Sequence, residues 1–203
     1  ALEAMMADLG FGWKKQAGFT GGTVILTEKE DQARISEMRK SGLNIMMSMK
    51  TSAKPVSFVE DCAVALPDLA EYTDKLTKIF TKYKTTGTWY AHASVGCLHV
   101  RPVLDMRNSE DVAAMRKIAE ETFQLVKDYG GSHSGEHGDG IARSEFNEVM
   151  FGKKMAALFK QVKQMLDPQS IFNPGKITDS PKMDDRSLFR FAPGYKIDDF
   201  PTK

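Results

Sequence analysis

Two strand-like segments near the middle of the chain, 85–92 and 97–104, are separated by only four residues. Parallel strands are joined by a crossover of about a dozen residues or more, so these two segments must pair in antiparallel fashion. Segments rich in helix-forming residues flank them on both sides. This pattern predicts an α+β fold, in which an antiparallel sheet is covered by helices on one face.

The other elements are predicted from hydrophobic periodicity and from breaking residues. Short strands are expected at 23–26 and 56–64, and the glycine-rich segment 130–140 is expected to be loop or short strand. The last 30 residues are polar, contain four prolines and are predicted to form an extended tail. The predicted helices cover 1–15, 28–47, 67 to about 80, 109 to about 128, and about 144 to 166 with a break at Gly152.

Charge balance and cysteine count exclude several classes of protein. Lys plus Arg total 28 and Asp plus Glu total 27, so no basic face for nucleic acid is expected. The two cysteines, Cys62 and Cys97, form no CxxC pair, which excludes a four-thiolate iron–sulfur cluster within this chain. No apolar run of about 18 residues exists, so no transmembrane segment is expected. No signal peptide is visible, and we expect a cytoplasmic protein, or one held peripherally at the inner face of the membrane.

The four histidines, at positions 92, 99, 133 and 137, all lie within one stretch of 46 residues. A two-residue turn at Val95–Gly96 would pair His92 directly with His99, with their Cβ atoms about 5 Å apart. Two imidazoles on one face of a hairpin can bind a single metal ion. The alternative is a hairpin with two ordinary histidines, and in one uninterrupted strand the two side chains would point to opposite faces.

The segment 132–140 places Glu136 and His137 among three glycines. Glycine lets the backbone approach a ligand closely, and a Glu beside a His supplies one anionic ligand and one general base. With the two hairpin histidines, Glu136 forms a three-ligand set that leaves coordination positions open, as catalytic metal sites do. The alternative for this segment is a polar loop without a ligand.

Three motifs, in order along the chain, resemble the C-terminal domain of FAD-linked oxidases. They are His-Ala-Ser-Val-Gly-Cys-Leu-His at 92–99, Gly-Glu-His-Gly-Asp-Gly at 135–140 and Phe-Asn-Pro-Gly-Lys at 172–176. This family includes D-lactate dehydrogenases, the glycolate oxidase D subunit and D-2-hydroxyglutarate dehydrogenases. The resemblance implies the ferredoxin-like cap domain of a vanillyl-alcohol-oxidase type flavoprotein.

The resemblance also implies a division of the chain. Residues 30–180 would form the FAD-linked oxidase C-terminal domain, and residues 1–29 would lead in from a missing FAD-binding domain. The tail at 181–203 would run toward a further domain, of the iron–sulfur type that large members of the family carry. The chain has no initiator methionine, which agrees with a fragment of a longer protein.

The same resemblance assigns a metal site and a base. It implies that His92, His99 and Glu136 bind a divalent metal, with zinc, iron and manganese all compatible with two imidazoles and a carboxylate. It implies that His137 is the active-site base.

Substrate and flavin contacts are implied at three further positions. Arg39 falls where the family often has an arginine for the substrate carboxylate, and Asn173 lies in the motif close to the flavin. Arg101 stands where some members carry a substrate-contacting asparagine and would bind a second anionic group. The hairpin departs from the usual pattern because Cys97 replaces an asparagine.

The resemblance implies oxidation of a 2-hydroxy acid of the D-lactate, glycolate or D-2-hydroxyglutarate type to the 2-oxo acid, with hydride passing to FAD. The FAD would be held mainly by a domain absent from this chain, and the two arginines favour a dicarboxylate substrate. The alternative is a non-catalytic metal-binding or partner-binding module derived from the family. A zinc hydrolase is a third hypothesis, which the lack of an HExxH motif weakens.

Three other features have open interpretations. His133 is a candidate to hold Glu136 from behind the metal site. Arg143 is either a further cation near the site or part of a surface salt bridge. Glu60 and Asp61 are predicted to be a helix-capping or loop carboxylate pair.

Overall fold

The computed structural model describes residues 2–11, 23–190 and 195. The chain divides into two compact units, Ala1–Ser48 and Met49–Lys203. The first unit contains α1 (Leu2–Asp8) and α2 (Lys29–Met47), so the predicted helix at 28–47 is confirmed. The predicted strand at 23–26 is wrong, because 23–27 has no regular structure. Part of the helix predicted at 1–15 lies outside the described residues.

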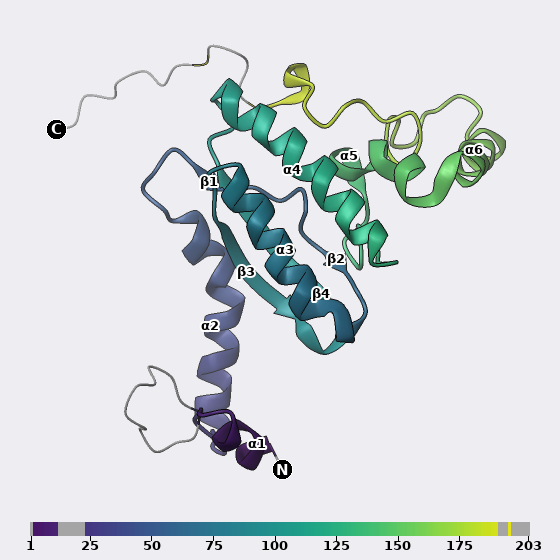
Figure 1. Cartoon of the computed structure of the whole chain (residues 1–203). Coiled ribbons are helices and arrows are strands. Elements are labelled where there is room, and N and C mark those ends of the chain that lie inside the picture. Colours follow the sequence, from purple (N-terminus) through teal and green to yellow (C-terminus); the bar gives the residue numbers. More distant parts are fainter. Residues whose placement is uncertain (1, 12–22, 191–194, 196–203) are drawn as a thin grey trace. The chain divides into compact units, whose positions relative to one another are not determined.

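The second unit is organised around one central strand, β4 (Cys97–Leu104). The three other strands all pair with β4 in antiparallel fashion, which confirms the predicted sheet type (Figure 1). They are β1 (Lys54–Pro55), β2 (Cys62–Ala63) and β3 (Gly87–His92). The long strand predicted at 56–64 is therefore reduced to β2, because the chain turns at Asp61, where φ is 80°.

The β3–β4 hairpin is longer at its turn than predicted. Tyr90 pairs with His99, and His92 pairs with Cys97, so the predicted direct pairing of His92 with His99 is wrong by two positions. The connection is a 3-10 turn, Ala93–Val95, followed by Gly96. A shift of two residues keeps a side chain on the same face of a strand. His92 and His99 therefore still share a face, as diagonal neighbours.

Gly96 is required at the end of this turn for two reasons. Its φ is 71°, in the left-handed region that side chains rarely adopt. In addition, a Cβ at this position would lie 1.9 Å from the carbonyl oxygen of Val64. The turn can therefore form in this way only with glycine.

Two helices cover one face of the sheet, α3 (Leu69–Lys82) and α4 (Ser109–Asp128) (Figure 1). The short 3-10 turn Leu66–Asp68 leads into α3, and the Asn108 side chain caps α4 by accepting a hydrogen bond from the N–H of Glu110. The apolar stripe of α4 is buried. The core formed by these helices and the sheet includes Tyr72, Leu76, Phe80, Leu98, Val100, Val112, Met115, Ile118, Phe123 and Val126.

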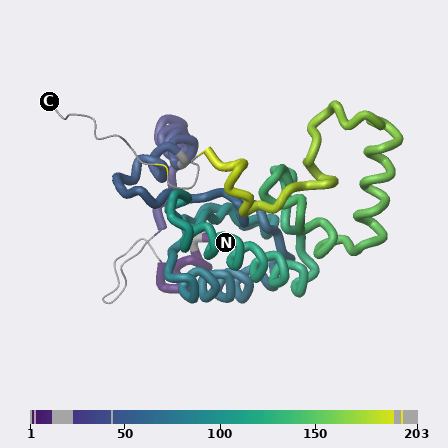
Figure 2. Tube along the Cα trace, turned by 90° about the horizontal axis from the view of Figure 1, so that it is seen from above, coloured from purple at the N-terminus to yellow at the C-terminus, as the bar shows by residue number. Residues whose placement is uncertain are grey.

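Beyond the sheet, the chain forms α5 (Gly140–Arg143), a 3-10 turn (Ser144–Phe146) and α6 (Asn147–Leu166). The predicted break in α6 is confirmed, since Gly152 has φ 81° and ψ 160°. After α6 the chain turns back (Figure 2), and Asn147 Nδ2 donates to the carbonyl of Ile177. Another 3-10 turn, Arg186–Leu188, lies near the end of the continuously described segment 23–190. Among the described residues, no helix combines the length and apolar character needed to cross a membrane.

Candidate metal and substrate site

The hairpin supplies the first half of the site. His99 lies in β4, with 5 % of its surface exposed, and His92 lies at the end of β3 with a half-exposed side chain. Their ring centroids are 5.0 Å apart, and the planes are nearly perpendicular. The two imidazoles therefore meet, as predicted, although through the diagonal register.

The loop that follows α4 supplies the second half. Its Glu136 carboxylate reaches the hairpin, where Oε1 lies 2.9 Å from His99 Nε2 and 3.6 Å from His92 Nε2. The same oxygen is 3.4 Å from Nε2 of His137. The His137 ring stacks on the His99 ring with centroids 4.9 Å apart and planes 12° from parallel. The structure thus brings together all four residues predicted as metal ligands or base.

The donor set fits a first-row divalent ion. A four-coordinate ion with bonds of about 2.0–2.1 Å separates its ligand atoms by about 3.3–3.4 Å. The separations of 2.9 and 3.6 Å from Glu136 to the two hairpin imidazoles lie on either side of this value. One ligand atom from each of His92, His99 and Glu136 can be chosen so that all lie within 4.8 Å of one another.

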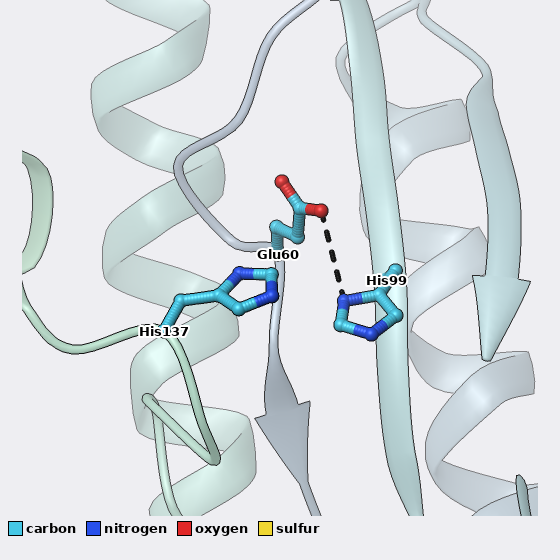
Figure 3. A group of neighbouring side chains, drawn as sticks. All are labelled: Glu60, His99 and His137. Atoms are coloured by element: carbon cyan, nitrogen blue, oxygen red, sulfur yellow. Dashed lines mark ion pairs between the residues drawn. The ribbon is translucent and has the colours of Figure 1, made fainter. Parts of the chain in front are cut away.

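Glu60 lies beside His99, with its carboxylate facing Nδ1 (Figure 3), whereas Glu136 lies at the other ring nitrogen, Nε2. It is only 3 % exposed, and its Oε1 is 3.6 Å from His99 Nδ1. Arg101 binds both oxygens of Glu60, at 2.6 and 2.8 Å, and the Ser57 hydroxyl donates a further hydrogen bond. Burial alone would raise the pKa of Glu60, but the hydrogen bonds from Arg101 and Ser57 outweigh burial and lower it. Glu60 is therefore held as a carboxylate.

Arg101, which was predicted to bind an anionic group of the substrate, is thus the partner of Glu60. Its guanidinium lies on the same side of the sheet as His99, as the alternation along β4 requires. It is, however, already bound to an internal carboxylate, and its side chain is only 17 % exposed. A substrate anion would have to share this guanidinium with Glu60.

Asp61 is completely buried and holds the loop that carries Glu136 and His137. It accepts hydrogen bonds from the backbone N–H groups of both residues, each at 2.8 Å. Arg143, also buried, places Nη1 3.4 Å from Asp61 Oδ2 and donates to the Glu60 carbonyl. Arg143 is thus a cation near the site, and its interpretation as a surface salt bridge is wrong.

Sequence reasoning missed the importance of Glu60 and Asp61. A loop carboxylate was predicted, and Asp61 does bind a loop, but nothing in the local pattern indicated that this loop is part of the site. His133 also differs from expectation. It lies between the rings of Phe123 and Phe151, with Nε2 3.5 Å from Asp139, and it makes no described contact with Glu136.

The remaining predicted residues are placed as follows. Asn173 has φ 46° and lies in the loop after α6. It lines a cleft of about 780 Å³ that also includes His137. Arg39 lies on α2 in the first unit and is exposed. The walls of the cleft are largely apolar and include Phe159, Val162, Leu166, Phe172 and Ile177.

Cys97 is the first residue of β4, directly after the turn, and its thiol is not reactive. Its Sγ lies 3.5 Å from Asp61 Oδ1. Burial, together with the nearby Asp61 carboxylate, raises the pKa of the Cys97 thiol to about 12. At neutral pH it is therefore a protonated hydrogen-bond donor to Asp61.

Known proteins resemble this chain both as a family and as individual relatives. Residues 11–177 match the family model described as FAD linked oxidases, C-terminal domain. D-2-hydroxyglutarate dehydrogenase of Escherichia coli is 34 % identical over 183 residues, which cover 90 % of this chain and 17 % of that protein. D-lactate dehydrogenase of Archaeoglobus fulgidus is 30 % identical over 151 residues, covering 74 % of this chain and 32 % of that protein.

A third relative, glycolate oxidase subunit GlcD of Bacillus subtilis, is 28 % identical over 149 residues, covering 73 % of this chain and 31 % of that protein. The chain thus spans between a sixth and a third of the length of these relatives. The family model covers most of the chain, and the α+β fold with its antiparallel sheet is the one expected for it. The chain belongs to the family of C-terminal domains of FAD-linked oxidases.

Proposed function

We propose that this chain is the substrate- and metal-binding part of an FAD-dependent dehydrogenase that oxidises a 2-hydroxy acid to the 2-oxo acid. The observation that carries the proposal is the convergence of three imidazoles on Glu136 Oε1, at distances of 2.9 to 3.6 Å, beside the cleft that His137 and Asn173 line. The relatives are named as D-2-hydroxyglutarate dehydrogenase, D-lactate dehydrogenase and a glycolate oxidase subunit, which supports the substrate class.

In this proposal His92, His99 and Glu136 hold zinc, iron or manganese. When bound, the ion supplies Lewis-acid chemistry, which lowers the pKa of a coordinated hydroxyl group. FAD, bound mainly by parts of the protein outside this chain, supplies the hydride acceptor. Since no four-thiolate cluster can be built from Cys62 and Cys97, an iron–sulfur group that accepts electrons would also lie outside this chain.

The chain's own residues then have distinct tasks. His137 Nε2 takes the proton of the substrate hydroxyl, and its stacking on the buried His99 ring fixes the imidazole beside Glu136. Arg101 shares its guanidinium between Glu60 and a carboxylate of the substrate, because a guanidinium matches a carboxylate with two parallel hydrogen bonds. Arg39 is proposed for a second carboxylate from its place in the sequence alone. Asn173 lies at the cleft where the flavin would approach. Two arginines favour a dicarboxylate substrate.

The test uses the full-length protein that contains this chain, purified with FAD. Flavin reduction is followed after mixing with D-lactate, glycolate and D-2-hydroxyglutarate, separately and without oxygen. Loss of a general base lowers kcat by about 100- to 10,000-fold, so His137→Gln should reduce the flavin slowly at every substrate concentration. Lys78→Gln, an exposed change on α3, should behave as the wild type.

Failure of all three acids to reduce the wild-type flavin would contradict the proposal and favour a non-catalytic metal- or partner-binding module. Ester hydrolysis by the zinc-loaded chain without FAD would instead favour a hydrolase. A His137→Gln variant as fast as the wild type would remove His137 from the role of base.

A further inference from the structure

Two consecutive carboxylates lie between the two halves of the site. Glu60 is 3 % exposed and Asp61 is fully buried, and neither belongs to the three motifs that characterise the site. In an extended strand, consecutive side chains point to opposite faces. The left-handed φ of 80° at Asp61 interrupts that alternation, and both carboxylates contact residues of the site. Asp is one of the few residues other than glycine that adopts this conformation readily.

Asp61 determines where the loop half of the site lies. Its Oδ1 accepts the N–H of Glu136 and its Oδ2 the N–H of His137, while its backbone carbonyl accepts the N–H of Gly135 at 2.8 Å. The Ser134 hydroxyl donates to Oδ2 at 3.3 Å. Three consecutive backbone N–H groups are thus bound to one residue, which fixes the direction in which the Glu136 and His137 side chains leave the chain.

The charge of Asp61 is balanced inside the protein. A buried carboxylate without a partner is strongly destabilising, so its retention requires compensation. Arg143 provides a nearby cation, with Nη1 3.4 Å from Oδ2, and the backbone N–H groups of the loop provide charge-assisted hydrogen bonds. The loop and the carboxylate therefore stabilise each other.

Glu60 determines the orientation of the hairpin half. Figure 3 shows its carboxylate facing His99 Nδ1, across the 3.6 Å separation. Nδ1 is buried and has no hydrogen-bond partner among the described residues, whereas Nε2 faces Glu136 at 2.9 Å. A carboxylate beside one ring nitrogen favours the proton there, which leaves a lone pair on the other nitrogen for a metal.

We propose that Glu60 and Asp61 are the positioning residues of this site, Glu60 for the His99 imidazole and Asp61 for the backbone of Glu136 and His137. This inference rests on the metal site in the proposed function. An alternative is that Glu60 itself binds an ion with His99 and His137, whose donor atoms lie close enough. The oxygens of Glu60 already accept hydrogen bonds from Arg101 and Ser57, which favours the positioning role.

The test is a titration of the metal-free chain with Co²⁺, whose visible spectrum reports both occupancy and coordination geometry. The variants are Asp61→Asn and Glu60→Gln, which keep side-chain volume but remove the charge. Loss of a residue that supports a metal ligand weakens metal binding by about 10- to 100-fold. We expect Asp61→Asn at the upper end of this range and Glu60→Gln at the lower end, both with altered Co²⁺ spectra.

The matched control is Glu145→Gln, because Glu145 is a largely buried carboxylate that pairs with Arg116 and accepts the N–H of Met183, away from the site. Its Co²⁺ affinity and spectrum should equal those of the wild type. Wild-type affinity and spectrum in both Asp61→Asn and Glu60→Gln would overturn the inference while leaving the metal site intact. A wild-type chain that binds no Co²⁺ would instead overturn the metal site and, with it, the inference.

Hydrogen exchange in the wild-type chain provides a measurement that does not depend on whether Asp61→Asn folds. The backbone N–H groups of Glu136 and His137 should be strongly protected, although both residues are exposed, because both donate to the buried Asp61. Exchange of these two amides as fast as in an unstructured peptide would overturn the role of Asp61.

Discussion

The two halves of the site are built in different ways. His92 and His99 lie on a hairpin whose backbone ladder fixes their positions, whereas Glu136 and His137 lie on an irregular loop. The loop has no ladder of its own at these residues, and its N–H groups donate instead to Asp61, 75 residues away in the sequence for Glu136. Regular structure thus positions one pair of candidate site residues locally, while the other pair depends on one distant side chain.

The largest loss of stability is expected from a substitution in the hairpin. Gly96→Ala would place a Cβ 1.9 Å from the Val64 carbonyl oxygen, in addition to its unfavourable positive φ. We expect a loss of about 3 kcal/mol or more in the free energy of unfolding, measured by urea denaturation, because the backbone at Val64 or in the turn must move.

Gly130→Ala is the matched control, since Gly130 also has a positive φ, of 63°, but its added Cβ would have no neighbour within 4 Å. Its cost should be only about 1 kcal/mol, that of the left-handed backbone. Equal losses in the two variants would show that the turn yields easily and that the hairpin is less rigid than proposed.

A smaller effect is expected in the loop half. In Gly135→Ala the new Cβ would lie 3.0 Å from the Asp61 carbonyl oxygen and 3.3 Å from Asp61 Oδ1. We expect a loss of about 1–2 kcal/mol, because the loop must shift by a few tenths of an ångström. Co²⁺ affinity should fall as well, by about tenfold, since the hydrogen bonds to Asp61 are disturbed.

The same titration of Gly130→Ala should show wild-type affinity for Co²⁺, since that residue lies outside the Asp61 contacts. If Gly135→Ala loses stability and keeps full affinity, the position of the loop does not depend on its contact with Asp61.

The smallest effect is expected in the pH dependence of stability, through His133 in the loop that follows α4. Burial of His133 lowers its pKa, although the nearby Asp139 opposes this. The unfolded chain therefore binds a proton at His133 more readily than the folded chain does. The free energy of unfolding consequently falls as the pH drops below about 6.5, the ordinary pKa of histidine. His133→Leu should flatten the dependence of unfolding free energy on pH between about 7.5 and 5.

Phe123→Leu tests whether this effect comes from titration. It alters the ring next to His133 without removing a titratable group, so it should lower stability at every pH and keep the wild-type slope. A wild-type slope in His133→Leu would mean that other groups cause the acid sensitivity.

Local patterns predicted most of the fold. The short spacing between the two strands led to the antiparallel hairpin, and the periodicity of 109–128 led to a helix whose apolar stripe is buried. The candidate site residues could be identified in the sequence because His92, His99, Glu136 and His137 lie in recognisable motifs. The register could not, because the left-handed Gly96 closes a 3-10 turn as readily as a two-residue turn.

The roles of Glu60, Asp61 and Arg143 could not be predicted from local sequence patterns, for a physical reason. The Val56 to Val64 segment has the composition of a strand, but its pairing is cut short where Asp61 turns toward a loop far along the chain. Arg143 was ambiguous because its burial depends on Glu60 and Asp61, with which it has no sequence relationship. Such contacts are defined only by tertiary structure.

The hairpin and the loop are proposed to converge on one metal ion. Elemental analysis of the purified chain after incubation with zinc, iron or manganese tests it directly, with the wild type beside His99→Ala, Glu136→Ala and the control His133→Leu. We predict about one ion per chain in the wild type and in His133→Leu, and none in the other two, because each loses a ligand of a three-residue site. An ion retained in either His99→Ala or Glu136→Ala, or no ion in the wild type, would contradict a single metal site shared by the hairpin and the loop.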